Sequence, residues 1–199
     1  MQVAQIVFAN ADLDVAIAPV ASSIFLHSWQ TSVARLCLYF QRKVYGQVIE
    51  RLAEHAANLS VGHPMNLNTY LEPVINALQR RRIETYLSLP YLTLPYRGEA
   101  REQGGVLHAH ASADIPKDGF DVSATVVEAQ QQMKILKQEH FGPVTAAAPL
   151  GEPGEAIAMA NENPYGLSTQ VDCSGRSEAL APSTRRQAGC VLVNGAPPP

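Results

Sequence analysis

The sequence predicts an α/β fold, with a mainly parallel sheet flanked by helices. Segments rich in apolar and β-branched residues alternate with segments of helical spacing along the whole chain, which is typical of βαβ units. The chain has 199 residues, of which 46% are hydrophobic, so it is long enough and apolar enough to build one core. We therefore expect one domain, and the segments that should compose it are taken here in order.

Residues 3–9 are apolar and β-branched, which predicts a buried strand. Asn10 and Asp12 follow, and both are good helix N-caps. A helix over residues 13–28 should come next, broken or kinked at Pro19 because proline lacks the amide that a helix interior needs. A second strand is predicted over residues 35–41, where Leu36, Leu38 and Phe40 alternate.

The clearest helical pattern follows that strand. Apolar residues recur there at spacings of three and four and form one stripe: Val44, Val48, Ile49, Leu52, Ala56 and Leu59. Gly62 and Pro64 should end this helix. Another helix is predicted over residues 73–87, with a buried side made of Val74, Leu78, Ile83 and Leu87. The run Arg80 to Arg82 within it should point into solvent. Residues 89–105, rich in proline and glycine, should form a long surface connection.

The second half of the chain continues the alternation. Strands are predicted at residues 106–109, 124–127, 143–149, 167–172 and 190–193. Helices are predicted at residues 155–161 and 178–187, the latter with Pro182 inside. Residues 196–199 read Ala-Pro-Pro-Pro, which cannot pair in a sheet, so we expect a frayed tail.

Composition excludes several classes of function. The net charge of −3 and the scattered basic residues argue against a nucleic-acid partner. No apolar run approaches the roughly 20 residues that span a bilayer, so no membrane association is expected. Three widely spaced cysteines, Cys37, Cys173 and Cys190, indicate reduced thiols and a cytoplasmic setting. His108 and His110 lie two apart on a predicted strand, but no further ligand stands at a fixed spacing, so no metal site is predicted.

Several segments nevertheless share motifs with one enzyme family, in the family's order. They are residues 6–14, residues 40–45, Val61-Gly62-His63-Pro64, Pro73-Val74-Ile75-Asn76, Gln138-Glu139-His140-Phe141-Gly142-Pro143-Val144, residues 155–161, Asn163-Pro164-Tyr165-Gly166-Leu167-Ser168, and Ala188-Gly189-Cys190-Val191-Leu192-Val193-Asn194. Together they cover nearly the whole chain. On these motifs the chain resembles the NAD(P)-dependent aldehyde dehydrogenase superfamily.

The resemblance implies the three-layer, Rossmann-like catalytic domain of that family over residues 1–195, followed by the tail at 196–199. It implies NAD or NADP as cofactor and a small aldehyde as substrate. It also places the family's general base, its oxyanion asparagine and its cofactor domain before residue 1, so binding of the cofactor by this chain alone is not expected.

The family's nucleophilic cysteine aligns with Ser32. The family's glycine–glutamine–x–cysteine motif reads Trp29-Gln30-Thr31-Ser32 here, so a hydroxyl replaces the thiol and tryptophan replaces glycine. A serine hydroxyl is a poor nucleophile unless a base takes its proton. Cys37, Cys173 and Cys190 do not lie at the motif position, and we expect each of them to be a small buried thiol packed as a hydrophobe.

Two positions on the cofactor side are retained. Glu139 matches the glutamate that hydrogen-bonds the nicotinamide ribose, and Phe141 matches the aromatic residue beside the nicotinamide. Without the resemblance, Glu139 would be read as a solvated carboxylate and Phe141 as a core residue. His140 takes an apolar position of the motif and is expected to be partly exposed.

Three interpretations of function follow. The chain is a catalytically impaired aldehyde dehydrogenase domain, or a half-enzyme completed by another chain, or a binding and scaffolding module without catalysis. Loss of a flanking domain should expose an apolar face, and large apolar patches usually find a partner. We therefore expect self-association or a partner chain on that face.

Overall fold

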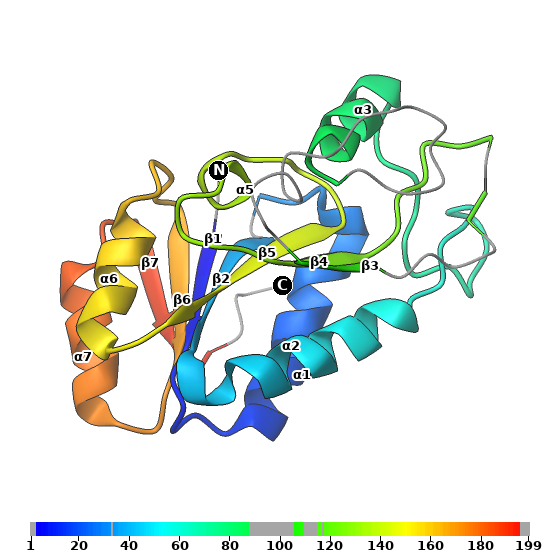
Figure 1. Ribbon diagram of the computed structural model, residues 1–199. Helices are drawn as coiled ribbons and strands as arrows, with labels where there is room; N and C mark the ends of the chain where they lie inside the picture. The colour runs from blue at the N-terminus through cyan, green and yellow to red at the C-terminus, as the bar shows by residue number, and fades with distance from the viewer. Residues whose placement is uncertain (1–2, 33, 88–105, 110–114, 117, 196–199) are drawn as a thin grey trace.

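A seven-stranded sheet forms the centre of the fold in the computed structural model, which describes residues 3–32, 34–87, 106–109, 115–116 and 118–195 (Figure 1). The strand order is β3-β4-β5-β2-β1-β6-β7. The strands are β1 (Val3–Val7), β2 (Arg35–Gln41), β3 (Val106–Ala109), β4 (Thr125–Glu128), β5 (Val144–Leu150), β6 (Ser168–Asp172) and β7 (Cys190–Val193). Only the edge pair β3–β4 is antiparallel, and the other neighbours are parallel.

Helices cover both faces of this sheet, so the fold has three layers (Figure 1). On one face lie α1 (Leu13–Phe25) and α2 (Arg42–Ala57), and on the other lie α6 (Pro153–Asn161) and α7 (Arg176–Arg185). The short α5 (Lys134–Lys137), which the sequence did not predict, precedes β5, and α3 (Ala77–Tyr86) lies beyond the sheet edge. The predicted α/β class with a mainly parallel sheet is confirmed.

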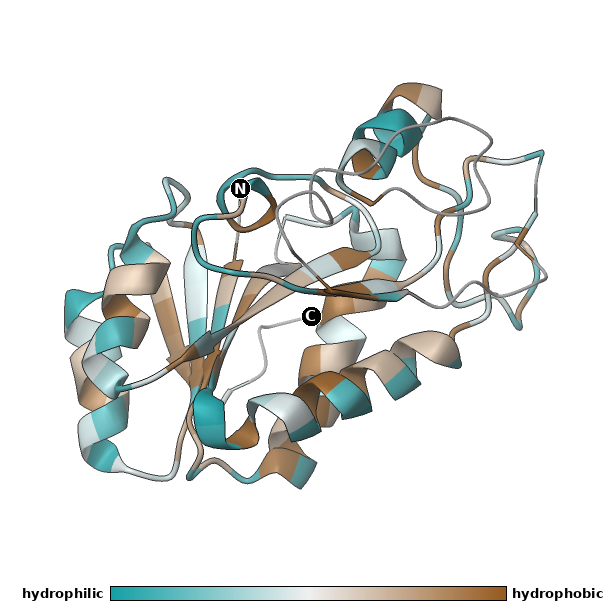
Figure 2. Ribbon diagram, viewed as in Figure 1, coloured by the Kyte–Doolittle hydropathy of each residue, from teal (hydrophilic) through white to brown (hydrophobic). Residues whose placement is uncertain are grey.

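The apolar stripe of α2 explains why this helix packs as it does. Val48, Ile49, Leu52 and Ala56 are all buried at spacings of three and four. Figure 2 shows apolar and polar residues alternating in bands along the helices, as in an amphipathic pattern. Among the described residues, none of the helices combines the length and the apolar character that crossing a membrane requires.

The first predicted helix is shorter than expected. Asp12 caps it through Oδ1, which accepts the amides of Asp14 and Val15 at 3.1 and 3.2 Å. The helix continues through Pro19, so the predicted break there is wrong, but it ends at Phe25 rather than at residue 28. The buried residues Ala16, Val20, Ala21, Ile24 and Phe25 flank the proline on both sides, and tertiary packing of this kind offsets the lost hydrogen bond. A 3₁₀ turn, η1 (Leu26–Trp29), follows.

The helix predicted over residues 73–87 begins at Ala77 instead. Asn76 is extended, with a φ of −166°, and its side chain accepts the Gln79 amide at 2.8 Å as an N-cap. Of the predicted buried side, Val74, Ile83 and Leu87 are buried, whereas Leu78 is 76% exposed. Leu78 lies five residues before Ile83, a spacing that does not place two residues on the same face of an α-helix, so Leu78 faces outward while Ile83 is buried.

The second half follows the prediction within a few residues. α7 covers residues 176–185 rather than 178–187 and is not broken by Pro182, and α6 begins at Pro153, in the first turn, where proline is tolerated. The surface connection predicted for 89–105 and the tail at 196–199 lie outside the described residues.

Candidate functional site at the amino edge of the sheet

The predicted nucleophile and the predicted cofactor-side residues meet at one edge of the sheet. Ser32 precedes β2, and Glu139 and Phe141 precede β5, the strand paired with β2. Both segments therefore reach the amino edge, where the parallel strands begin. Ser32 is exposed, while Glu139 and Phe141 are partly buried. Many α/β enzymes instead bind ligands at the carboxyl edge, so the candidate site lies at the opposite edge from the usual one.

The loop that carries Ser32 (residues 26–32, the Ser32 loop) has an uncommon backbone. His27, Ser28 and Trp29 have φ angles of 52°, 48° and 63°, all in the left-handed region. For residues other than glycine this conformation costs roughly 1–2 kcal/mol each. Such a stretch persists only where its surroundings hold it. The glycine of the family motif would take the conformation of Trp29 without that cost.

Two polar side chains of the loop tie it to the segment before α3. The Ser28 hydroxyl donates to the Glu72 carbonyl at 2.5 Å. The Gln30 Oε1 accepts the amide of Ile75 at 2.7 Å. Within the loop, the Gln30 amide donates to the His27 carbonyl at 2.9 Å. These contacts fix the backbone on both sides of Trp29.

Trp29 connects the loop to the cofactor-side motif. Its indole is buried and stacks on the His140 imidazole, with ring centroids 5.6 Å apart and an interplanar angle of 17°. It also meets the Phe141 ring edge-on, at 6.2 Å and 70°. The ring of Tyr86, on α3, lies 5.6 Å from that of His140, between centroids, at an interplanar angle of 54°. The Trp29 indole thus fills space between the two segments.

His140 is fully buried, so the expectation of partial exposure is wrong. Its Nε2 lies 2.8 Å from the Val144 carbonyl, and only a protonated nitrogen can donate to that oxygen. Its Nδ1 is buried and has no hydrogen-bond partner among the described residues. Burial lowers the pKa of this imidazole from its usual 6.5 to about 4, because a charged ring would be poorly solvated there. The ring is therefore neutral near pH 7.

The segment around Phe141 (residues 138–142, the Phe141 segment) is held by α3 through its backbone. The Gln79 amide donates to the Phe141 carbonyl at 2.7 Å, and the Arg82 guanidinium donates to the Glu139 carbonyl at 2.5 Å. Gly142 faces Ile83, whose Cδ1 would lie 2.1 Å from a Cβ at that position. The sequence missed this role of α3, because the arginine run was expected to point only into solvent. No local sequence pattern indicates these contacts, because Gln79 and Arg82 bind backbone carbonyls far along the chain.

A second polar cluster fixes the Asn-Pro-Tyr-Gly motif. Arg186 is buried, and its guanidinium donates to the Thr169 hydroxyl at 2.9 Å, the Asn161 Oδ1 at 2.8 Å and the Tyr165 carbonyl at 3.1 Å. Asn163 donates to the Leu136 carbonyl at 2.9 Å. These asparagines therefore join α6, α5 and the loop before β7, which is a structural role.

Replacing Arg186 by methionine should destabilise the protein by about 2 kcal/mol, because buried oxygens of Thr169, Asn161 and Tyr165 lose a charged donor. Urea denaturation monitored by circular dichroism measures the change. Arg185→Met is the matched control, since Arg185 is exposed and its substitution should leave the midpoint nearly unchanged. Equal midpoints for the two variants would contradict the assignment.

The cysteines divide into two groups. Cys37 and Cys173 are buried, as predicted, and burial raises the pKa of the Cys37 thiol to about 12. A thiol that resists ionisation is a poor nucleophile. Cys190 is exposed, so the expectation that it packs as a hydrophobe is wrong. It lies on β7, which is an edge strand of the sheet among the residues that the structure describes.

The predicted absence of a metal site rested on His108 and His110. His108 pairs with Glu128, with 2.5 Å between Nε2 and Oε1, and His110 lies outside the described residues. In the part of the chain that the structure describes, no group of three or more potential ligand side chains is close enough to hold a metal ion.

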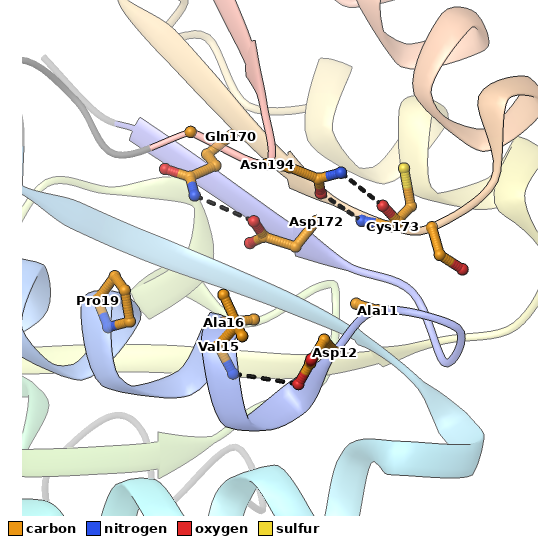
Figure 3. A pocket seen from close by; sticks show the side chains of 11 residues that line it. Ala11, Asp12, Val15, Ala16, Pro19, Gln170, Asp172, Cys173 and Asn194 are labelled. Carbon is orange, nitrogen blue, oxygen red and sulfur yellow. Dashed lines mark hydrogen bonds between the residues drawn. The ribbon is translucent and has the colours of Figure 1, made fainter.

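A cavity of about 400 Å³ lies at the carboxyl edge, away from Ser32 (Figure 3). The N-terminal half of α1 forms one wall and the ends of β6 and β7 form the other, with Asp172 and Asn194 between them. Asp172 is buried and accepts hydrogen bonds from the amides of Gln5 and Gln170. None of the predicted site residues lines this cavity.

The family model for the aldehyde dehydrogenase family matches residues 2–199. The chain belongs to this family. It is 30% identical over 189 residues to an aldehyde dehydrogenase of Alternaria alternata, which covers 95% of this chain and 36% of the relative. It is also 30% identical, over 190 residues, to the cytosolic aldehyde dehydrogenase 1 of Rattus norvegicus, again over 95% of this chain and 36% of the relative.

Solved structures of aldehyde dehydrogenases share the fold. The lactaldehyde dehydrogenase of Escherichia coli superposes with a TM-score of 0.85 at 26% identity, over 97% of this chain and 39% of that one. The structure of PnpE in complex with nicotinamide adenine dinucleotide gives a TM-score of 0.89 at 28% identity, over 100% of this chain and 39% of that one. This aldehyde dehydrogenase family chain thus spans somewhat over a third of the length of the relatives it matches.

Proposed function

We propose that the amino-edge site is the catalytic-domain share of an NAD(P)-dependent aldehyde oxidation, with Ser32 at the nucleophile position and Glu139 and Phe141 on the cofactor side. One observation carries this proposal: the Ser32 loop and the Phe141 segment, about 110 residues apart in the chain, meet through Trp29, which contacts Phe141 and His140. Residues 1–195 would form the catalytic domain, with a small aldehyde as substrate. Three free cysteines support a cytoplasmic setting.

The residues present fit the nicotinamide end of such a cofactor. Glu139 and Phe141 are held by their backbone carbonyls while their side chains keep part of their surface open. Glu139 would accept hydrogen bonds from ribose hydroxyls, and Phe141 would pack on the nicotinamide ring. When bound, the nicotinamide would supply a hydride acceptor. Whether NAD or NADP serves depends on contacts with the adenosine end, which Glu139 and Phe141 do not make.

Serine at position 32 should impair this chemistry. Attack on an aldehyde carbonyl requires the hydroxyl proton to leave, and a hydroxyl ionises far less readily than a thiol at neutral pH. Ser32 is exposed, so a substrate can reach it, and the expected low rate comes from the weak nucleophilicity of the hydroxyl. We propose that the chain alone has very low dehydrogenase activity.

Ser32→Cys should restore nucleophilic reactivity. We expect acetyl transfer from p-nitrophenyl acetate to position 32 to be at least about a hundredfold faster in this variant than in wild type, because a thiol supplies a thiolate near neutral pH. Mass spectrometry of the acylated peptide locates the adduct. Cys190→Ser is included in every protein compared, since Cys190 is the exposed native thiol.

Ser32→Ala is the matched control and should show no acylation at this position. The same proteins are then assayed for NAD(P)H at 340 nm with a panel of aldehydes. The proposal is wrong in its choice of nucleophile if the thiol introduced by Ser32→Cys is no more reactive than an average exposed thiol and no aldehyde is oxidised. Turnover by wild type would instead show that the serine is activated.

A further inference from the structure

One buried side chain touches both segments that carry the proposed site. Trp29 lies three residues before Ser32, and its two ring partners, His140 and Phe141, flank or belong to the cofactor-side positions. Trp29 is 1% exposed, so its indole is buried where these two rings meet it. The rest of the Ser32 loop contacts the chain before α3 but not the Phe141 segment in the hydrogen bonds described above.

The conformation of the loop depends on such contacts. Three consecutive residues in the left-handed region would relax if nothing held them. The Ser28 and Gln30 side chains hold the loop against Glu72 and Ile75, and the indole holds it against the Phe141 segment. Both the Ser32 loop and the Phe141 segment are thus held near α3. The loop bonds to residues 72 and 75 just before this helix, and Gln79 and Arg82 of the helix bind the backbone of the Phe141 segment. Loop, motif and α3 therefore form one packed unit.

The stack also depends on the shape of residue 140. A flat imidazole nearly parallel to the indole, at 17°, lets the two rings lie face to face, whereas a β-branched side chain would hold the indole away. Tyr86 also contacts the imidazole, with its ring tilted by 54°. By the resemblance, the family motif has glycine where Trp29 stands and an apolar residue where His140 stands, and these two side chains are in contact here.

We infer that Trp29 is a positioning residue that couples the Ser32 loop to the Phe141 segment, so that the two segments open and close as a single unit. The functional meaning rests on the proposed roles of Ser32, Glu139 and Phe141, but the coupling does not. Coupling between sites is reciprocal, so a ligand that orders the Phe141 segment should also order the Ser32 loop. Occupancy of the cofactor side would in this way fix the position of the nucleophile.

Hydrogen–deuterium exchange of the 199-residue chain tests the coupling. In Trp29→Gly, peptides covering residues 26–32, 72–80 and 138–144 should all exchange at least about tenfold faster, because local opening no longer requires unstacking of the indole. Glycine accepts a positive φ, so the variant adds no backbone strain. Trp29→Phe keeps an aromatic ring and should stay within about threefold of wild type.

Leu52→Ala is the matched control. Leu52 is fully buried on α2, so its truncation should destabilise the fold without touching the loop. If Leu52→Ala accelerates the same three peptides as much as Trp29→Gly does, or if Trp29→Gly affects residues 26–32 alone, the coupling is overturned. If Trp29→Gly does not fold, His140→Ile replaces the other ring of the stack. The same three peptides should then exchange faster, and the same results would overturn the coupling.

NADH provides a second readout that separates this inference from the proposed function. Trp29 is the only tryptophan of the chain, so its fluorescence reports the site alone. NADH should quench it, and should slow exchange in residues 26–32 of wild type but not of Trp29→Gly. Protection of residues 138–144 with equal behaviour of residues 26–32 in both proteins would overturn the coupling. Absence of any NADH effect would count against the proposed cofactor role, and the exchange of the free proteins would still decide the coupling.

Discussion

Lowering the pH from 7 toward 4 should cost the folded protein about 3 kcal/mol through His140 alone. Burial lowers the pKa of His140 from 6.5 to about 4 in the folded state, with the positive charge of Arg82 acting in the same direction. Between pH 6.5 and about pH 4, His140 binds a proton in the unfolded chain but stays neutral in the folded protein. Stability is therefore full above pH 6.5 and falls as the pH drops to about 4. The chemical cause is the missing solvation of a charged ring that is buried, stacks on Trp29 and lies beside Tyr86.

Urea denaturation at pH 7, 6, 5 and 4.5 measures this loss. His140→Gln retains a donor for the Val144 carbonyl but cannot take a proton, so its stability should depend much less on pH over this range. His63→Gln is the matched control, because His63 is exposed and its removal should leave the wild-type slope. Burial also lowers the pKa of His55, and all three proteins share that contribution. Parallel slopes for His140→Gln and wild type would show that the imidazole is solvated.

His140 also shows where sequence reasoning reaches its limit. The position could be recognised as an apolar one in the motif, but the residue found there is polar, and polarity alone predicts exposure. Burial became evident only once Trp29, 111 residues earlier, was seen to stack on it. A contact between two residues so far apart in the sequence leaves no periodic pattern, so one sequence does not reveal it.

The fold itself could be predicted more completely, because its signals are local. The stripe on α2 recurs at spacings of three and four residues, which the sequence displays directly. In β2 the strand was predicted, but its alternation was not a guide to burial, because Cys37, Leu38, Tyr39 and Phe40 are all buried in this central strand. The ends of helices were less accurate. The first helix stops at Phe25 because the loop after it is held by Glu72 and Ile75, partners that lie more than 40 residues away. Similarly, the continuation of α1 through Pro19 is decided by burial on the sheet and not by propensity.

The residues of the candidate site could be predicted to lie near one another, but the contacts that hold their segments could not. Motif order placed Ser32, Glu139 and Phe141 in one site, and the structure brings their segments to the same edge of the sheet. The helix that holds the Phe141 segment was not predicted, since Gln79 and Arg82 act on backbone carbonyls and not on side chains with a recognisable pattern. Contacts from a side chain to a distant backbone carbonyl depend on the three-dimensional structure, so they can be identified only once that structure is known.

Gly166→Ala should be among the most damaging single substitutions outside the amino-edge site, with a loss of about 3 kcal/mol. A Cβ at Gly166 would lie 2.7 Å from the backbone oxygen of Gln187. Because that atom belongs to the main chain, it cannot rotate away as a side chain could. The φ of Gly166 is not in the left-handed region, so glycine is required here by the close approach of two backbones and not by its conformational freedom.

The loop that Gly166 touches explains the size of the effect. Gly189 donates to the Gly166 carbonyl at 2.8 Å, and Gln187 donates to the Asn161 Oδ1 at 2.9 Å. A shift of this loop therefore disturbs the cluster around Arg186 and the start of β7 together. Thermal and urea denaturation should both report the loss. The matched control is Gly46→Ala, in the interior of α2, where a Cβ meets nothing within 4 Å and should stabilise the helix by up to about 1 kcal/mol. Equal stability of the two alanine variants would contradict this prediction. It would mean that residues 165–167 and 187–189 lie further apart than they do here, and that β7 is placed differently beside β6.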